Sequence, residues 1–183
     1  HTIGKLLLTA SLIAGALGLT GCHGSRGQSG FIVPEDFDTS RNYEITFWAK
    51  NDTNKTQTEI YKKAIEDFEE LYPNITVNLR LYTDYGKIYN DVITNIATDT
   101  TPNITYPDHI ATYLTGSNVV VPLDTLFTNE KYGLDGSELL FDGPTQDEII
   151  PKFLKECEFN GHYYALPYMR STEACYINKT YVE

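Results

Sequence analysis

Four side chains capable of binding a polar ligand follow the first strand-like segment of the sequence. Residues 43–47 alternate apolar and polar side chains, which is the period of a half-buried strand. Trp48, Lys50, Asn51 and Asp52 come directly after it and supply an aromatic ring, an ammonium group, an amide and a carboxylate. In parallel sheets, ligands bind beyond the carboxyl ends of the strands. These four residues are therefore a candidate binding site.

The residues that would position this site are predicted to form a strand, a helix and a second strand. Thr56-Gln57-Thr58-Glu59 fits a capping box at the start of the helix, and Pro73 ends it. One helix face carries Ile60, Ala64, Phe68 and Leu71, widened by Tyr61, Ile65 and Tyr72. Residues 75–81 alternate again, so the two strands should be parallel with a right-handed crossover.

The remaining sequence continues to alternate strands and helices, which indicates the α/β class. We expect a mixed, mostly parallel sheet flanked by helices in three layers. The expected elements are helices over 84–98, 107–114, 124–127 and 146–155, strands over 103–106 and from 171 to 178, a buried run over 119–123, and a hairpin over 158–163. Pro151 is expected to split or kink the helix over 146–155, and Asn160-Gly161 favours a type I′ turn.

The N-terminal residues carry an export pattern. An apolar run from Leu6 to Leu19 is too short to span a bilayer and leads into Leu19-Thr20-Gly21-Cys22. This order resembles the bacterial lipobox, which implies cleavage before Cys22 and a lipid on its sulfur; an ordinary secretory signal with an incidental cysteine is the alternative. We expect residues 1–21 to be a signal peptide, 22–41 a flexible tether and 42–183 a folded lobe on the outer face of the membrane.

Charge and cysteine content exclude several classes. The net charge is −11 and the basic residues are scattered, so nucleic acid is not expected as a partner. Metal-ligand spacing of cysteine or histidine is absent from the sequence, and so is a phosphate-binding loop, and we expect no cofactor. Cys157 and Cys175 could form a disulfide after export or remain two buried thiols.

Four stretches in order carry a family resemblance. They are the lipobox, residues 45–48 with the helix ending at Pro73-Asn74-Ile75, Pro102-Asn103-Ile104 leading to Val121-Pro122-Leu123-Asp124, and residues 160–179. Together they resemble the extracellular solute-binding proteins of bacterial ABC importers, in the carbohydrate-binding group that includes maltose-binding protein. Asn103 and His162 depart from the Asp and Lys common there. The chain looks like an N-terminal fragment: one periplasmic-binding-protein-like lobe, with the second lobe missing.

The resemblance implies that a ligand is held between two closing lobes. Carried over to this sequence, the contacts come from residues 48–52, 106–109 and 168–172. The implied ligand-binding residues are Trp48, Lys50, Asn51, Asp52, Tyr106, Asp108, His109, Tyr168, Arg170 and Ser171. Aromatic rings would stack on the apolar face of a sugar, and polar side chains would bind its hydroxyls. The alternatives are core packing for Trp48, a solvated charge for Lys50, a helix cap for Asp108 and a salt bridge within the lobe for Arg170.

The implied function is that of a monomeric, lipid-anchored receptor, which is not an enzyme. It would bind a carbohydrate and deliver it to the transmembrane subunits of an ABC permease. One alternative keeps the fold but changes the ligand to a peptide, a polyamine or a metal. Another is a secreted glycoside hydrolase, which would need two carboxylates about 5–10 Å apart. No spacing of Asp and Glu singles out such a pair.

Overall fold

The computed structural model describes residues 32–51, 55–106, 119–169, 171 and 173–181. The first elements are β1 (Tyr43–Lys50), α2 (Lys55–Leu71), β2 (Ile75–Tyr82) and α3 (Tyr85–Ile96). The later ones are α5 (Asp124–Phe127), η1 (Gln146–Glu148), α6 (Pro151–Lys155), β3 (Glu158–Phe159), β4 (His162–Tyr163) and η2 (Lys179–Tyr181). The predicted helix over 107–114 and the predicted lipid site at Cys22 lie outside the described residues.

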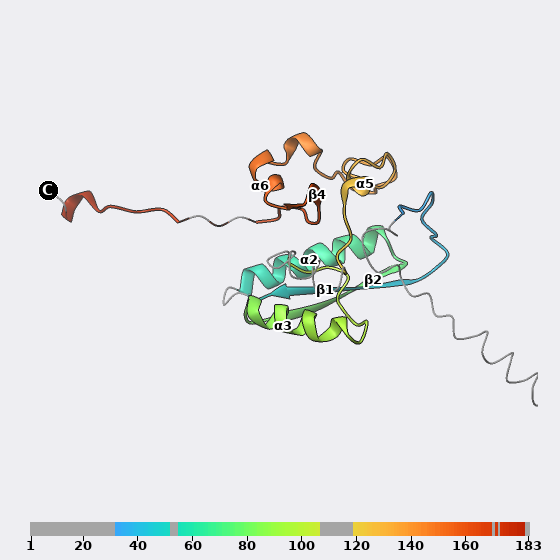
Figure 1. Ribbon diagram of the computed structural model, residues 1–183, viewed down its shortest axis with the longest axis horizontal. Helices are drawn as coiled ribbons and strands as arrows, with labels where there is room; N and C mark the ends of the chain where they lie inside the picture. The colour runs from blue at the N-terminus through green and yellow to red at the C-terminus, as the bar shows by residue number, and fades with distance from the viewer. Residues whose placement is uncertain (1–31, 52–54, 107–118, 170, 172, 182–183) are drawn as a thin grey trace, which may run out of the picture.

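Strands β1 and β2 run parallel and pair over their whole length, from Tyr43 opposite Ile75 to Lys50 opposite Tyr82. Figure 1 shows α2 on one face of this pair and α3 on the other, which is the predicted three-layer arrangement. Ile104 extends the sheet on the other side of β1, where its carbonyl accepts a hydrogen bond from the Trp48 N–H at 3.0 Å. In the part of the chain that the structure describes, β1 is therefore central and β2 is an edge strand.

Helix α2 differs from its prediction in its start and in its buried face. It begins at Lys55, so Thr56 lies inside the first turn and is not the cap of a capping box. Ile60 is 54% exposed, whereas Tyr61 is the buried residue of the helix. The ring of Tyr61 meets Phe47 of β1 edge-on at 5.7 Å. Packing against the strand thus rotates the helix away from the face that its apolar residues alone predict.

Helix α3 starts where the sequence indicates and closes the core. The Asp84 carboxylate caps it by accepting a hydrogen bond from the Lys87 N–H at 2.9 Å. Its residues Ile88 and Val92 are buried against Trp48 and Tyr82. This cluster joins β1, β2 and α3, so side-chain packing against α3 holds the carboxyl ends of both strands in place.

The open edge of β2 contacts a carboxylate. The Glu69 side chain of α2 accepts a hydrogen bond at 2.7 Å from the N–H of Val77, in the middle of the strand. Beside it, α2 and β2 line a shallow groove with the side chains Lys62, Ile65, Glu66, Val77, Leu79 and Leu81. One backbone donor of the edge strand is therefore satisfied within the chain.

The C-terminal half lies on the side of α2 that faces away from the sheet (Figure 1). The predicted helix over 146–155 is split into η1 and α6 with Pro151 at the start of the second part, as expected. Asn160 (φ 52°) and Gly161 (φ 84°) form the turn of the β3–β4 hairpin with the two positive φ angles that a type I′ turn requires. The run over 119–123 is half-buried rather than buried.

The segment after residue 170 differs from its prediction. The described residues between 171 and 178 form no strand, because they extend away from the body, where nothing pairs with their backbone (Figure 1); Tyr176 is 93% exposed. Cys157 is buried and Cys175 exposed, and the two do not form a disulfide with each other. Residues assigned to the tether contact the body, since the Lys131 ammonium donates to the Glu35 carbonyl at 2.7 Å. Within the described ranges, no helix has the length and apolarity to cross a membrane.

Candidate functional site

The carboxyl end of β1 brings together part of the predicted site. Trp48, Lys50, Asn51, Tyr106 and Tyr168 are described there, and Ser171 is exposed further along the chain. The other predicted ligand-binding residues lie outside the described residues: Asp52, Asp108, His109 and Arg170.

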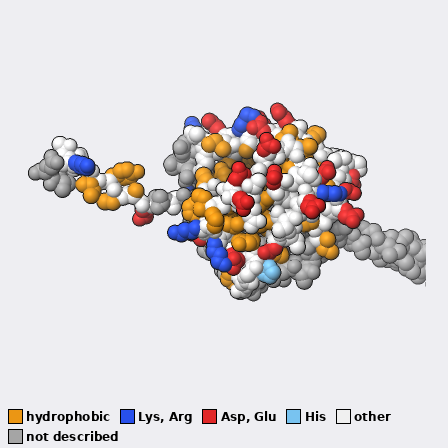
Figure 2. Space-filling model, turned by 90° about the horizontal axis from the view of Figure 1, so that it is seen from above, with side chains coloured by type: hydrophobic (Ala, Val, Ile, Leu, Met, Phe, Trp, Pro, Cys, Tyr) orange, Lys and Arg blue, Asp and Glu red, His pale blue; other side chains and the backbone are white. Residues whose placement is uncertain are grey.

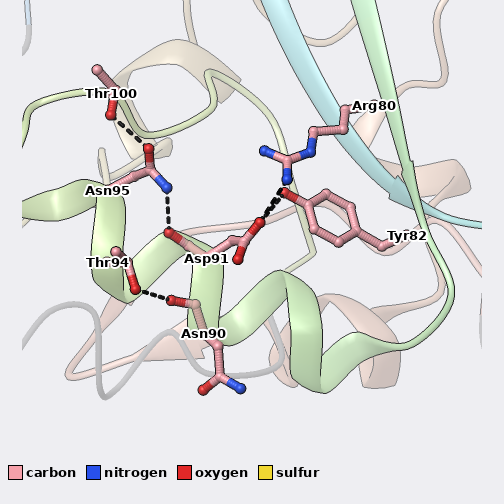
Figure 3. Close-up of polar contacts among 7 residues, drawn as sticks. All are labelled: Arg80, Tyr82, Asn90, Asp91, Thr94, Asn95 and Thr100. Carbon is pink, nitrogen blue, oxygen red and sulfur yellow. Dashed lines mark hydrogen bonds and ion pairs between the residues drawn. The ribbon is translucent and has the colours of Figure 1, made fainter.

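The side chain of Trp48 is part of the buried core cluster. Its side chain is 6% exposed, and its ring lies 5.5 Å from that of Tyr82. The Arg80 guanidinium stacks over both rings, 4.9 Å from the Trp48 ring and 4.6 Å from the Tyr82 ring. Figure 3 shows that Arg80 and Tyr82 both reach the Asp91 carboxylate of α3. Core packing, the alternative for Trp48, is what this structure shows.

Lys50 and Asn51 lie at the end of β1 and are held by neighbouring elements. The Lys50 N–H donates to the Tyr106 hydroxyl at 3.4 Å, and its ammonium lies 5.1 Å from the centre of the Tyr85 ring. The Asn51 N–H donates to the Tyr82 carbonyl at 2.7 Å, and its side-chain oxygen accepts from the Thr58 hydroxyl at 2.6 Å. The backbone here is thus held by Tyr106 and β2, and the two side chains contact α2 and α3.

Four tyrosines gather around this strand end and form what we call the tyrosine wall: Tyr61, Tyr85, Tyr106 and Tyr168. The Tyr61 and Tyr106 hydroxyls are 2.8 Å apart. The Tyr85 ring meets the Tyr106 ring edge-on at 5.3 Å, and the Tyr168 ring lies 6.3 Å from that of Tyr61. Tyr85 is 46% and Tyr168 61% exposed, so two of the rings are open to a ligand.

Burial raises the pKa of three phenols of the wall, which are those of Tyr61, Tyr106 and Tyr168. Loss of solvent, followed by the hydrogen bond to Tyr106, raises the pKa of Tyr61 far above its ordinary value. Loss of solvent is also the largest cause that raises the pKa of Tyr106 and of Tyr168. At neutral pH these three residues therefore present uncharged hydroxyl groups beside flat rings. This surface suits an uncharged ligand that has both apolar faces and oxygen atoms.

Sequence reasoning did not assign Tyr61 and Tyr85 to the site. Tyr85 could have been found, because it comes soon after the end of β2, and the rule on parallel strand ends that selected Asn51 after β1 applies to it as well. Tyr61 carries no comparable signal, since a tyrosine on the apolar face of a helix reads as a core residue. Among the described residues no group of three or more His, Cys, Asp or Glu side chains is placed to hold a metal ion.

Comparison with known proteins gives a match to a family model and a similarity to a solved structure. Residues 53–183 match the family model described as bacterial extracellular solute-binding protein. The structure is similar to that of an extracellular solute-binding protein family 1 from Alicyclobacillus acidocaldarius subsp. acidocaldarius DSM 446, with a TM-score of 0.51 and 18% sequence identity. The match covers 69% of this chain and 28% of that protein, and at this identity it concerns the fold alone. Comparison with curated protein sequences found no match.

Proposed function

We propose that this chain, which belongs to the family of bacterial extracellular solute-binding proteins, is part of a receptor. The receptor binds a carbohydrate and delivers it to an ABC permease. Membership in this family indicates a binding role outside the cytoplasmic membrane. The finer statements, which are the sugar ligand, the two-lobed trap, the lipid anchor at Cys22 and the lack of an enzymatic reaction, are parts of the proposal.

The tyrosine wall carries the proposal of a sugar ligand. A pyranose presents C–H groups on its faces and hydroxyls around its rim. The exposed rings of Tyr85 and Tyr168 can stack on the first, while the hydroxyl of Tyr106 and the side chain of Asn51 can bind the second. The rings are held from several elements, so little ordering of side chains is needed when the ligand binds.

Asp52, Asp108, His109 and Arg170 remain in the proposed site from the family resemblance, together with Lys50 and Ser171. Binding between two lobes would shift the protein toward a closed form by the difference in affinity of the ligand for the open and closed forms. Because the chain spans only 28% of the structurally similar protein, the second wall of such a trap is part of the proposal.

The test is a thermal-shift panel on the receptor expressed over its whole reading frame. A ligand at 100 times its dissociation constant stabilises a protein by about 2.7 kcal/mol, so a bound sugar should raise the melting temperature by several degrees. We expect neutral oligosaccharides to give the shift and Tyr85→Ala to abolish most of it. Tyr176→Ala is the matched control, because Tyr176 is 93% exposed and lies outside the wall.

A shift with polyamines or peptides and none with sugars would refute the carbohydrate proposal but keep the binding role. Cleavage of the added oligosaccharides during the assay would instead support the glycoside hydrolase alternative. Equal loss of the shift in Tyr85→Ala and Tyr176→Ala would remove the wall from the binding site.

A further inference from the structure

A series of hydrogen bonds connects Gln57, Tyr61 and Lys50 to the Tyr106 hydroxyl of the tyrosine wall. The Gln57 side-chain amide donates to the Tyr61 oxygen at 3.2 Å, and the Tyr61 and Tyr106 oxygens are 2.8 Å apart. The Lys50 backbone N–H donates to the same Tyr106 oxygen at 3.4 Å. Both outer groups of this series are N–H groups, which can only donate.

The donors at the two ends determine where the protons lie. A phenol has one proton to donate and two lone pairs that accept. The Tyr61 oxygen accepts from Gln57. Tyr61 is 5% exposed, so its own proton needs an acceptor within the protein, and the Tyr106 oxygen at 2.8 Å provides it.

The Tyr106 oxygen consequently accepts two hydrogen bonds, from Tyr61 and from the Lys50 N–H. Its own proton finds no acceptor in the described part of the chain, although the residue is half-buried at the wall. Hydrogen-bonded hydroxyls in series polarise one another, so a phenol that accepts two such bonds is a stronger donor. Polar groups in such places normally have a partner.

We propose that Tyr106 donates a hydrogen bond to an oxygen of the bound solute, and that Tyr61 and Gln57 are positioning residues that keep it a donor. The inference deepens the proposed function and rests on it. It selects solutes with an acceptor oxygen at this place, such as a sugar hydroxyl or ring oxygen. A protonated polyamine offers only donors and does not fit.

The experiment is a double-mutant cycle on the receptor expressed over its whole reading frame. Its probe is the oligosaccharide that gives the largest thermal shift, and dissociation constants are measured by calorimetry. Removing a neutral hydrogen bond should weaken binding about tenfold in Tyr106→Phe and a few-fold in Tyr61→Phe. The double variant should bind no more weakly than Tyr106→Phe, because Tyr61 acts through the Tyr106 hydroxyl.

Two further variants separate this role from a general loss of structure. Tyr132→Phe is the matched control, because it removes a hydroxyl that accepts a hydrogen bond from the Phe37 N–H at 2.8 Å, away from the wall. It should leave the affinity unchanged. Gln57→Met leaves the buried ring in place and should weaken binding a few-fold. The inference is overturned if Tyr106→Phe binds like the wild type, or if the effects of Tyr61→Phe and Tyr106→Phe multiply.

A ligand-free measurement tests the direction of the hydrogen bonds separately. Protein labelled with 3-fluorotyrosine is titrated and followed by fluorine NMR, with the Tyr106 signal assigned from Tyr106→Phe. A hydrogen bond accepted from Tyr61 stabilises the Tyr106 phenolate, so Tyr61→Phe should raise the pKa of Tyr106. A lowered pKa would show that Tyr106 donates to Tyr61 and would overturn the inference. If no solute binds the wild type, the carbohydrate proposal fails and this titration decides the donor order.

Discussion

The carboxylate of Asp91 on α3 joins the helix to the edge strand β2, and its removal should destabilise the lobe measurably. One of its oxygens accepts hydrogen bonds from the Arg80 guanidinium at 2.7 Å and from the Tyr82 hydroxyl at 2.9 Å (Figure 3). Both residues also pack against the ring of Trp48. We expect Asp91→Ala to lower the free energy of unfolding by about 2 kcal/mol.

The size follows from the exposure of each partner. The Arg80 and Asp91 side chains are 55% and 38% exposed, so their ion pair contributes about 0–1 kcal/mol. Tyr82 is only 7% exposed, and a hydrogen bond to a charged acceptor contributes about 1.5–3 kcal/mol. Alanine is the better helix former than aspartate by roughly 0.5 kcal/mol, which offsets part of the loss. Asp91→Asn keeps an acceptor oxygen for Tyr82 and should cost about half as much.

Urea unfolding followed by tryptophan fluorescence checks this prediction, because Trp48 is the single tryptophan of the chain and packs on Tyr82. The matched control is Asp67→Ala on α2, which removes an exposed ion pair with Lys63 that involves no buried group. It should cost no more than about 0.5 kcal/mol. The reasoning is refuted if Asp91→Ala destabilises the chain no more than Asp67→Ala does.

Two further predictions concern alkaline stability and the lipid anchor. Burial, followed by the hydrogen bond to Asp91, raises the pKa of Tyr82 from about 10 to about 12, so its contribution to stability is complete below about pH 10 and is lost as the pH rises through 12. The stability difference between wild type and Tyr82→Phe, from urea unfolding, should shrink by roughly 2 kcal/mol between about pH 9 and pH 11.5; a constant difference would contradict this. Cys22→Ser in the exporting bacterium should move the protein from the membrane to the soluble fraction, because the acyl chains are lost; retention on the membrane would rule out the lipobox.

Local sequence patterns predicted the elements that form because of their own residues and not because of distant contacts. The alternation in residues 43–47 and 75–81 and the Asn160-Gly161 turn correspond to β1, β2 and the β3–β4 hairpin. Each depends on side-chain period or on backbone angles of one or two residues. The predicted strand from residue 171 did not form in the described chain, because a strand also needs a neighbour for its backbone groups.

The candidate site was harder to predict, because tertiary packing decides which way its side chains face. Trp48 lies near the carboxyl end of β1, as a residue facing the crevice would, but α3 and the Arg80 guanidinium cover its ring. Tyr61 looks like a helix residue of the core, yet its hydroxyl meets that of Tyr106, which is 45 residues away in the sequence. The side-chain period within one helix or strand gives no information about such a contact between two distant segments.

The hydrogen bond from Val77 to Glu69 bears on how such a protein behaves at high local concentration. An unpaired strand edge is a template on which a second chain can add by backbone pairing, and satisfying its N–H groups blunts that growth. Receptors tethered to a membrane would be crowded in two dimensions, where neighbouring edges meet often. The Glu69 carboxylate, which accepts a hydrogen bond from the N–H in the middle of β2, makes self-association into extended sheets less favourable. This effect requires no contact with the tyrosine wall.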